Sequence, residues 1–111
     1  MEMRISTDLD GLLDLIHDRW FDLTECVFDQ GSREFRLSLS DRREGPYSQK
    51  LLIVADVTDV AIRDEAQIQI YDLCNVRITS SSIHILSGMP LEIVLTIGDQ
   101  WSIQLLSLIH I

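Results

Sequence analysis

The sequence predicts an α+β fold that is mainly β, with one N-terminal helix followed by about eight antiparallel strands. Apolar and polar residues alternate along most of the chain after Trp20, and a period of two places alternate side chains on one face of a strand. Short turns containing Gly, Pro, Asp or Ser separate these runs, which favours antiparallel neighbours. Residues 8–18 have a helical period instead.

The predicted helix spans residues 8–18. Its apolar residues follow the spacing i, i+3, i+4, i+7, and they are Leu9, Leu12, Leu13 and Ile16. This spacing gives one apolar stripe, which we expect to pack on a sheet. Ser6 or Thr7 can cap the start of the helix, and His17 and Arg19 lie near its end, where the helix dipole favours positive charge.

The strands are predicted from short alternating or continuous apolar runs. They lie at 23–28, 35–39, 51–55, 68–71, 76–79, 83–85, 91–97 and 101–105, and residues 57–62 either continue the run at 51–55 or form a separate short strand. The first two runs predict a hairpin, and the last two predict another hairpin with Gly98-Asp99-Gln100 as its turn. We expect these strands to form a curled sheet, a sandwich or a half-barrel in a single domain covering 1–111.

The composition restricts the classes of partner. The formal net charge is −9, which argues against binding to nucleic acid and to anionic membranes. We see neither a signal peptide nor a stretch long and apolar enough to span a bilayer, so we expect a cytoplasmic protein. Cys26 and Cys74 lie in apolar-rich segments and are expected to be two free, buried thiols.

No motif predicts catalysis, a metal site or a cofactor. The chain has neither a phosphate-binding glycine loop nor a nucleophile elbow, so we expect a protein that is not an enzyme. Its three histidines, His17, His84 and His110, equal the number that a catalytic zinc can use, but their spacing does not indicate that they meet. His84 alternates with two isoleucines and is expected on the wetter face of its strand.

Three groups of residues are candidate binding sites. An acidic series is a candidate surface for a basic protein partner, or a solvated rim: Asp56, Asp59, Asp64, Glu65 and Asp72. An arginine cluster either pairs with the chain's own carboxylates or binds a small anion: Arg33, Arg36, Arg42 and Arg43. The apolar C-terminus is either a buried strand or an exposed edge that joins two copies: Leu106, Leu108, Ile109 and Ile111.

The layout also resembles small acidic bacterial β-rich domains, some of which are similar to immunity proteins of toxin systems. The residues that carry this resemblance are His17-Asp18-Arg19-Trp20-Phe21-Asp22, Phe35-Arg36-Leu37-Ser38-Leu39 and the segment 50–60. The resemblance implies an inhibitor that binds a basic toxin domain, and it transfers no functional residue. Together with the acidity, it leads us to expect a non-enzymatic protein-binding module. The alternatives are a homo-oligomer joined through the C-terminal strand and a binder of small anions that uses the arginine cluster.

Overall fold

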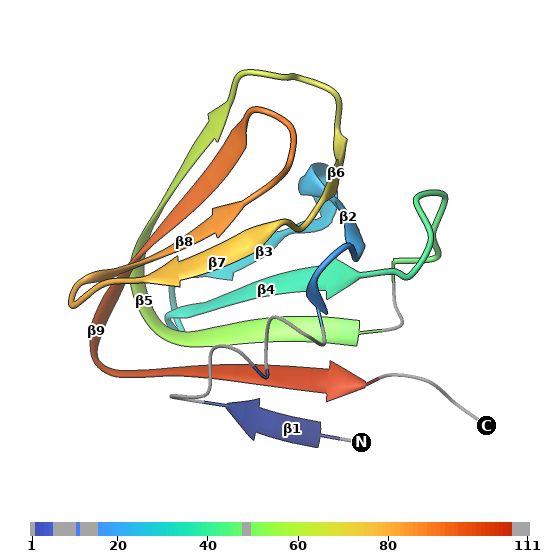
Figure 1. The fold of residues 1–111 in the computed structure, drawn as a ribbon. Helices are drawn as coiled ribbons and strands as arrows, with labels where there is room; N and C mark the ends of the chain where they lie inside the picture. Colours follow the sequence, from blue (N-terminus) through green and yellow to red (C-terminus); the bar gives the residue numbers. More distant parts are fainter. Residues whose placement is uncertain (1, 6–10, 12–15, 48–49, 108–111) are drawn as a thin grey trace.

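The computed structural model describes residues 2–5, 11, 16–47 and 50–107. These residues form two antiparallel sheets (Figure 1). The larger sheet has seven strands: β1 (Glu2–Ile5), β3 (Val27–Asp29), β4 (Glu34–Leu39), β5 (Lys50–Asp64), β7 (Asn75–Ile78), β8 (Ser82–Leu86) and β9 (Leu91–Ser107). The smaller sheet pairs β2 (Trp20–Asp22) with β6 (Ile70–Asp72), and a short 3-10 helix, η1 (Leu23–Glu25), follows β2.

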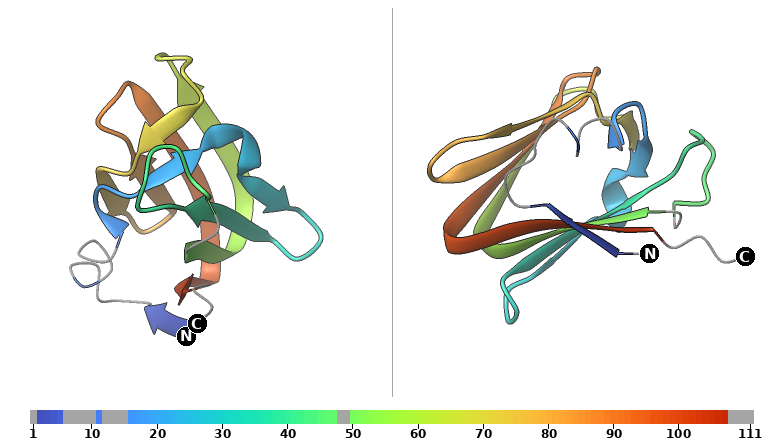
Figure 2. Two further views of the ribbon diagram at one scale, coloured as in Figure 1. Left: turned by 90° about the vertical axis from the view of Figure 1, so that its right-hand side faces the viewer. Right: turned by 60° about the horizontal axis from the view of Figure 1, so that its bottom comes forward.

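Two long strands, β5 and β9, run through both halves of the larger sheet and bend between them (Figures 1 and 2). In one half, β9 lies between β5 and β1, and β4 and β3 continue the sheet beyond β5. In the other half, β8 and β7 continue the sheet beyond β9. The bend folds one half over the other, so the larger sheet makes both walls of the core without closing on itself.

The bend lies where the register of β5 and β9 shifts, on either side of Val57. Asp56 adopts a left-handed backbone, with φ of 58°, and its Oδ2 accepts a hydrogen bond of 2.8 Å from the backbone N–H of Gln100. Gly98 lies against the same carboxylate, because a Cβ at this residue would be 2.3 Å from Asp56 Oδ2. The corner is therefore an interruption in the pairing of β5 and β9, and the Asp56 side chain bridges it.

Alternate residues of β4 and β8 face the core, as the period of two predicts. In β4, Phe35, Leu37 and Leu39 are buried while the residues between them are half-buried. Phe21 of β2 and Tyr71 of β6 are also fully buried, and their rings stack with centroids 6.0 Å apart. The small sheet thus covers the core at the end opposite the corner. Trp20 pairs there with Ser40, just beyond β4.

Several predictions about elements are confirmed and others need correction. The mainly β architecture is confirmed, and β3 pairs with β4 as the first predicted hairpin requires. Residues 23–25 of the predicted strand 23–28 instead form the 3-10 helix η1. The second hairpin is wrong: Gly98-Asp99-Gln100 lies inside one strand, and both parts of β9 pair with β5. Residues 51–62 likewise belong to one strand.

The predicted helix falls mostly on 8–10 and 12–15, which lie outside the described residues. The described part adds only that Ile16 is fully buried and that a turn follows it. The structure therefore does not support the helix, and it stays a prediction. The thiols are free, but Cys74 is exposed and Cys26 is half-buried, so the prediction that both are buried is wrong.

Candidate functional site

An apolar groove lies between the small sheet and the turn that joins β8 to β9. Its volume is about 400 Å³. Its lining residues are Trp20, Arg43, Ile68, Ile70, Asp72, Gly88 and Met89. Met89 is 46% exposed and Ile68 is 42% exposed, so two large apolar side chains meet solvent here beside an indole ring.

Strand alternation puts the apolar lining on the outside of the small sheet. Because Phe21 and Tyr71 point into the core, their neighbours Trp20 and Ile70 point the other way. The guanidinium of Arg43, in the loop after β4, lies 5.9 Å from the centre of the Trp20 ring, a cation–π distance. The groove thus has one cationic wall.

Asp72 fixes the other wall, which is the β8–β9 turn. Its Oδ1 accepts hydrogen bonds of 2.7 Å from the Ser87 hydroxyl and 3.2 Å from the Gly88 backbone N–H. A Cβ at Gly88 would lie 2.8 Å from Asp72 Oδ2, so a side chain there would force the carboxylate to shift. The contact holds Met89 at the rim.

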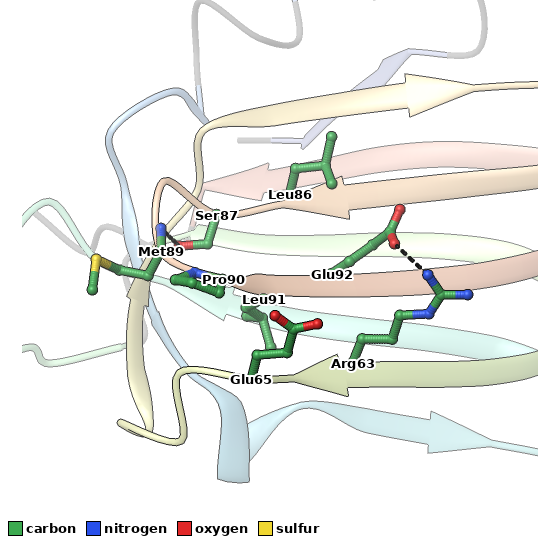
Figure 3. A pocket seen from close by; sticks show the side chains of 8 residues that line it. All are labelled: Arg63, Glu65, Leu86, Ser87, Met89, Pro90, Leu91 and Glu92. Carbon is green, nitrogen blue, oxygen red and sulfur yellow. Dashed lines mark hydrogen bonds and ion pairs between the residues drawn. The ribbon is translucent and has the colours of Figure 1, made fainter.

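A second, more polar hollow of about 300 Å³ lies on the other side of the same turn (Figure 3). Its lining residues are Arg63, Glu65, Leu86, Ser87, Met89, Pro90, Leu91 and Glu92. Arg63 Nη1 lies 3.8 Å from Glu92 Oε1 across it (Figure 3). The β8–β9 turn is therefore a ridge between an apolar groove and a charged hollow.

The structure splits the predicted acidic series. Asp64, Glu65 and Asp72 lie around the β8–β9 turn, since the Glu65 backbone N–H donates to the carbonyl of Pro90. Asp56 is at the corner and Asp59 is on β5, opposite Thr96. Three of the five also have internal partners: Asp56 bonds to Gln100, Asp64 accepts from the Tyr71 hydroxyl, and Asp72 holds the turn.

The arginine cluster does not converge on one point. Arg33 precedes β4, and Arg42 and Arg43 follow it. Three of the four lie near carboxylates: Arg33 is 3.6 Å from Asp56, Arg36 is 2.7 Å from Glu34 and Arg42 is 3.8 Å from Glu44. This matches the interpretation of internal pairing, and only Arg43 joins the groove.

The predicted C-terminal interface is described only at Leu106. This residue is half-buried and lies between Leu51 of β5 and Glu2 of β1, so its strand is not an edge at this point. Leu108, Ile109 and Ile111 lie outside the described residues, as does His110.

Of the other histidines, His17 is exposed and 3.2 Å from Asp18, and His84 is on the outer face of β8. No group of three or more side chains suited to a metal lies together in the part of the chain that the structure describes.

The groove and most of its lining residues were not predicted from the sequence. Trp20, the pair Ile68 and Ile70, and Met89 come from three separate segments, and no local period brings these segments together. The one sequence feature that these residues share is an apolar side chain next to a turn. No family model, curated protein or solved structure matches this chain. Among the described residues, none of the helices has the length and apolar character needed to cross a membrane.

Proposed function

We propose that this chain is a protein-binding module that docks an apolar side chain of a basic protein in the groove between Trp20 and Met89. The observation that carries the proposal is the exposure of Met89 and Ile68 beside an indole ring in one hollow. Exposed apolar patches with a polar rim are typical of protein interfaces, and aromatic residues and Met are enriched in them. The one carboxylate of the lining, Asp72, is used to hold the β8–β9 turn, so the proposed role of this site is binding.

Charge selects the kind of partner. The chain has 18 acidic and 9 basic residues, and a negative field of this size attracts positively charged surfaces and speeds their association. The exposed Glu65 and the rim carboxylate Asp72 stand near the groove. A partner segment with Lys or Arg on each side of an apolar anchor would therefore match it. Inhibition of a basic toxin domain, as immunity proteins perform, is the specific form of this proposal.

The test is capture of partners from a host lysate with matched variants. Met89→Ser and Ile68→Ser remove apolar surface from the groove, whereas Val27→Ser removes it from β3, where Val27 is 48% exposed and outside the groove. We expect one basic protein to bind the wild type and Val27→Ser and to be lost from both groove variants. With the purified pair, binding should weaken as salt rises and should shift Trp20 fluorescence in a Trp101→Phe background. Equal capture by all variants, or an acidic partner, would contradict the proposal.

A further inference from the structure

Ser82, His84 and Glu92 form a line of hydrogen-bonded side chains on the outer face of β8 and β9. Ser82 Oγ lies 2.9 Å from Nε2 of His84, and Nδ1 of the same ring lies 2.9 Å from Glu92 Oε2. His84 and Glu92 are each 20% exposed. We infer that Ser82 is a nucleophile activated by His84 and Glu92, and that this face accepts an acyl group from small carboxylic esters.

The order of the contacts matches the roles that acyl transfer needs. A ring that donates its Nδ1–H to the Glu92 carboxylate presents Nε2 as an acceptor to the Ser82 hydroxyl. The base is then oriented by an acid and aimed at the nucleophile, the arrangement by which serine hydrolases are recognised across unrelated folds. This inference goes beyond the proposed binding function and replaces the prediction that the chain is not an enzyme.

Strand geometry holds the three groups in place. Ser82 and His84 are two residues apart on β8, so they share a face. On β9, Val94 lies opposite His84 and Glu92 lies opposite Leu86, which makes Glu92 the diagonal neighbour of His84. Side chains on paired strands are positioned more firmly than side chains on loops.

Thr79 marks where a substrate oxygen would sit. Its Oγ1 is 2.8 Å from Ser82 Oγ, and it accepts hydrogen bonds from the backbone N–H groups of Ser82, at 3.0 Å, and Ser81, at 3.3 Å. Two backbone donors thus converge beside the nucleophile, which is the requirement for stabilising an ester oxyanion. Rotation of the Thr79 side chain would free them, while the Thr79 backbone N–H still donates to the carbonyl of Ser82 at 2.8 Å and keeps the turn closed.

Acyl transfer from p-nitrophenyl acetate to Ser82, followed by hydrolysis, accounts for every bond and proton. Ser82 Oγ forms a bond to the acyl carbon as its proton moves to Nε2 of His84, and the bond to p-nitrophenolate breaks with its electron pair on the leaving oxygen. The proton passes from His84 to the phenolate. Water then attacks the acyl-serine and gives its proton to His84, which returns it to Ser82 Oγ as acetic acid leaves. No oxidant or metal is required.

The first test is labelling by a fluorophosphonate, which replaces its fluoride with the oxygen of an activated serine. We expect one label per chain, on the peptide that contains Ser82, and none on Ser82→Ala. His84→Ala should label on the order of a hundredfold more slowly, as expected for loss of a positioned base. Glu92→Gln should also slow labelling, because its amide favours the wrong ring tautomer. Each variant is first shown to keep the wild-type thermal midpoint within a few degrees.

Matched controls separate this cluster from its surroundings. Ser80→Ala removes another exposed hydroxyl from the same turn and should label at the wild-type rate. Val27→Ser, at an exposed residue of β3 that lies outside both proposed sites, should do so too. An unlabelled wild type, a label on another residue or an unchanged rate in His84→Ala would overturn the inference.

Thr79→Ala tests the oxyanion position. Removing the hydroxyl frees both backbone N–H groups, so release of p-nitrophenolate should be faster than in the wild type. A hydroxyl with a purely structural role predicts the opposite, because its loss would loosen the turn around Ser82. An unchanged or lower rate in the folded variant would overturn the placement of the oxyanion.

Discussion

At the corner of the sheet, one carboxylate and one glycine determine the path of two strands. Asp56 Oδ2 occupies the space that a side chain at Gly98 would need and caps the Gln100 backbone N–H. The backbone of Gly98 does not have a positive φ, so its requirement for glycine is steric. The left-handed conformation belongs to Asp56, a residue type that tolerates it better than most.

Gly98→Ala should therefore destabilise the fold. We expect a loss of about 1–3 kcal/mol in the free energy of unfolding, the range for overpacking, measured by urea denaturation. In an Asp56→Gly background the carboxylate is absent, so the same substitution should cost much less. Gly31→Ala is the control, because its added Cβ would be 3.3 Å from the nearest atom, Asp29 Oδ1, instead of 2.3 Å as at Gly98. Equal costs of Gly98→Ala in both backgrounds would show that the clash is not with Asp56.

Tyr71 carries the buried hydroxyl that links the small sheet to the end of β5. The hydroxyl donates to Asp64 and accepts from the backbone N–H of Ile68 at 3.1 Å. Burial raises the pKa of this phenol, and its hydrogen bond to Asp64 raises the pKa further. Below pH of about 10, the ordinary phenol value, Tyr71 is neutral in the folded and unfolded chain. Above it the unfolded chain ionises first, so stability falls as pH rises.

Tyr71→Phe should cost about 1–2 kcal/mol at pH 8, the range for a lost hydrogen bond. The difference in stability between the wild type and the variant should shrink between pH 10 and 11, since only the wild type loses this stabilisation. Urea unfolding across pH 8–11 measures both effects. The comparison is made in a Tyr47→Phe background because the pKa of Tyr47 is raised too. A difference that stays constant or grows with pH would contradict the argument.

At the scale of the element, β9 is a single strand that serves both halves of the sheet. Its first part pairs with β8 and β5, and its last part pairs with β1 and β5. A hairpin at residues 98–100 would instead place the two parts of β9 against each other. The long partner β5 prevents this by offering a continuous edge on both sides of the corner.

Designed cysteine pairs distinguish these arrangements. In a Cys26→Ser, Cys74→Ser background, Ala55→Cys with Ser102→Cys and Ala61→Cys with Val94→Cys join residues that face each other across β5 and β9. Both pairs should oxidise to disulfides, as cross-strand Cβ atoms are close enough with small adjustments. Thr96→Cys with Ser102→Cys, which would face each other in the hairpin, should stay reduced. Intact mass under non-reducing conditions shows which pairs have formed disulfides. A disulfide in this third pair alone would support the hairpin and contradict the continuous strand β9.

At the scale of the whole molecule, β1 decides whether the C-terminal strand can join two copies. It pairs with residues 103–106 of β9 on the side away from β5, so the backbone groups there are already used. An unpaired apolar strand edge would invite a second chain. In the described part of the chain, β1 therefore covers the edge of β9 through which two copies were expected to join.

Light scattering tests this directly. The full chain and a version truncated after Ser107 should both be monomers, whereas removal of residues 1–5 should expose the edge of β9 and give dimers or larger species. Restoring the N-terminal segment as a synthetic peptide should reverse the association. If the full chain is a dimer and the version truncated after Ser107 is a monomer, the apolar tail is the dimer interface.

The sequence by itself determined the mainly β class and the core-facing sides of β4 and β8, because alternation is a property of neighbouring residues. It also located the hairpin of β3 and β4. Only the tertiary structure decided the path of β9, because a Gly-Asp-Gln turn signal suits a hairpin and a bulged corner equally. The choice depends on pairing with β5, more than thirty residues away along the chain.

Pairing between strands that are distant in the sequence also explains why the two proposed sites could not be predicted. Ser82 and His84 share a face by local period, but Glu92 joins them only through the register of β8 and β9. Trp20 and Met89 meet across the groove because β2 pairs with β6 and Asp72 of β6 holds the β8–β9 turn. The sequence specified the chemistry of these side chains, while strand pairing between distant segments decided which of them could act together.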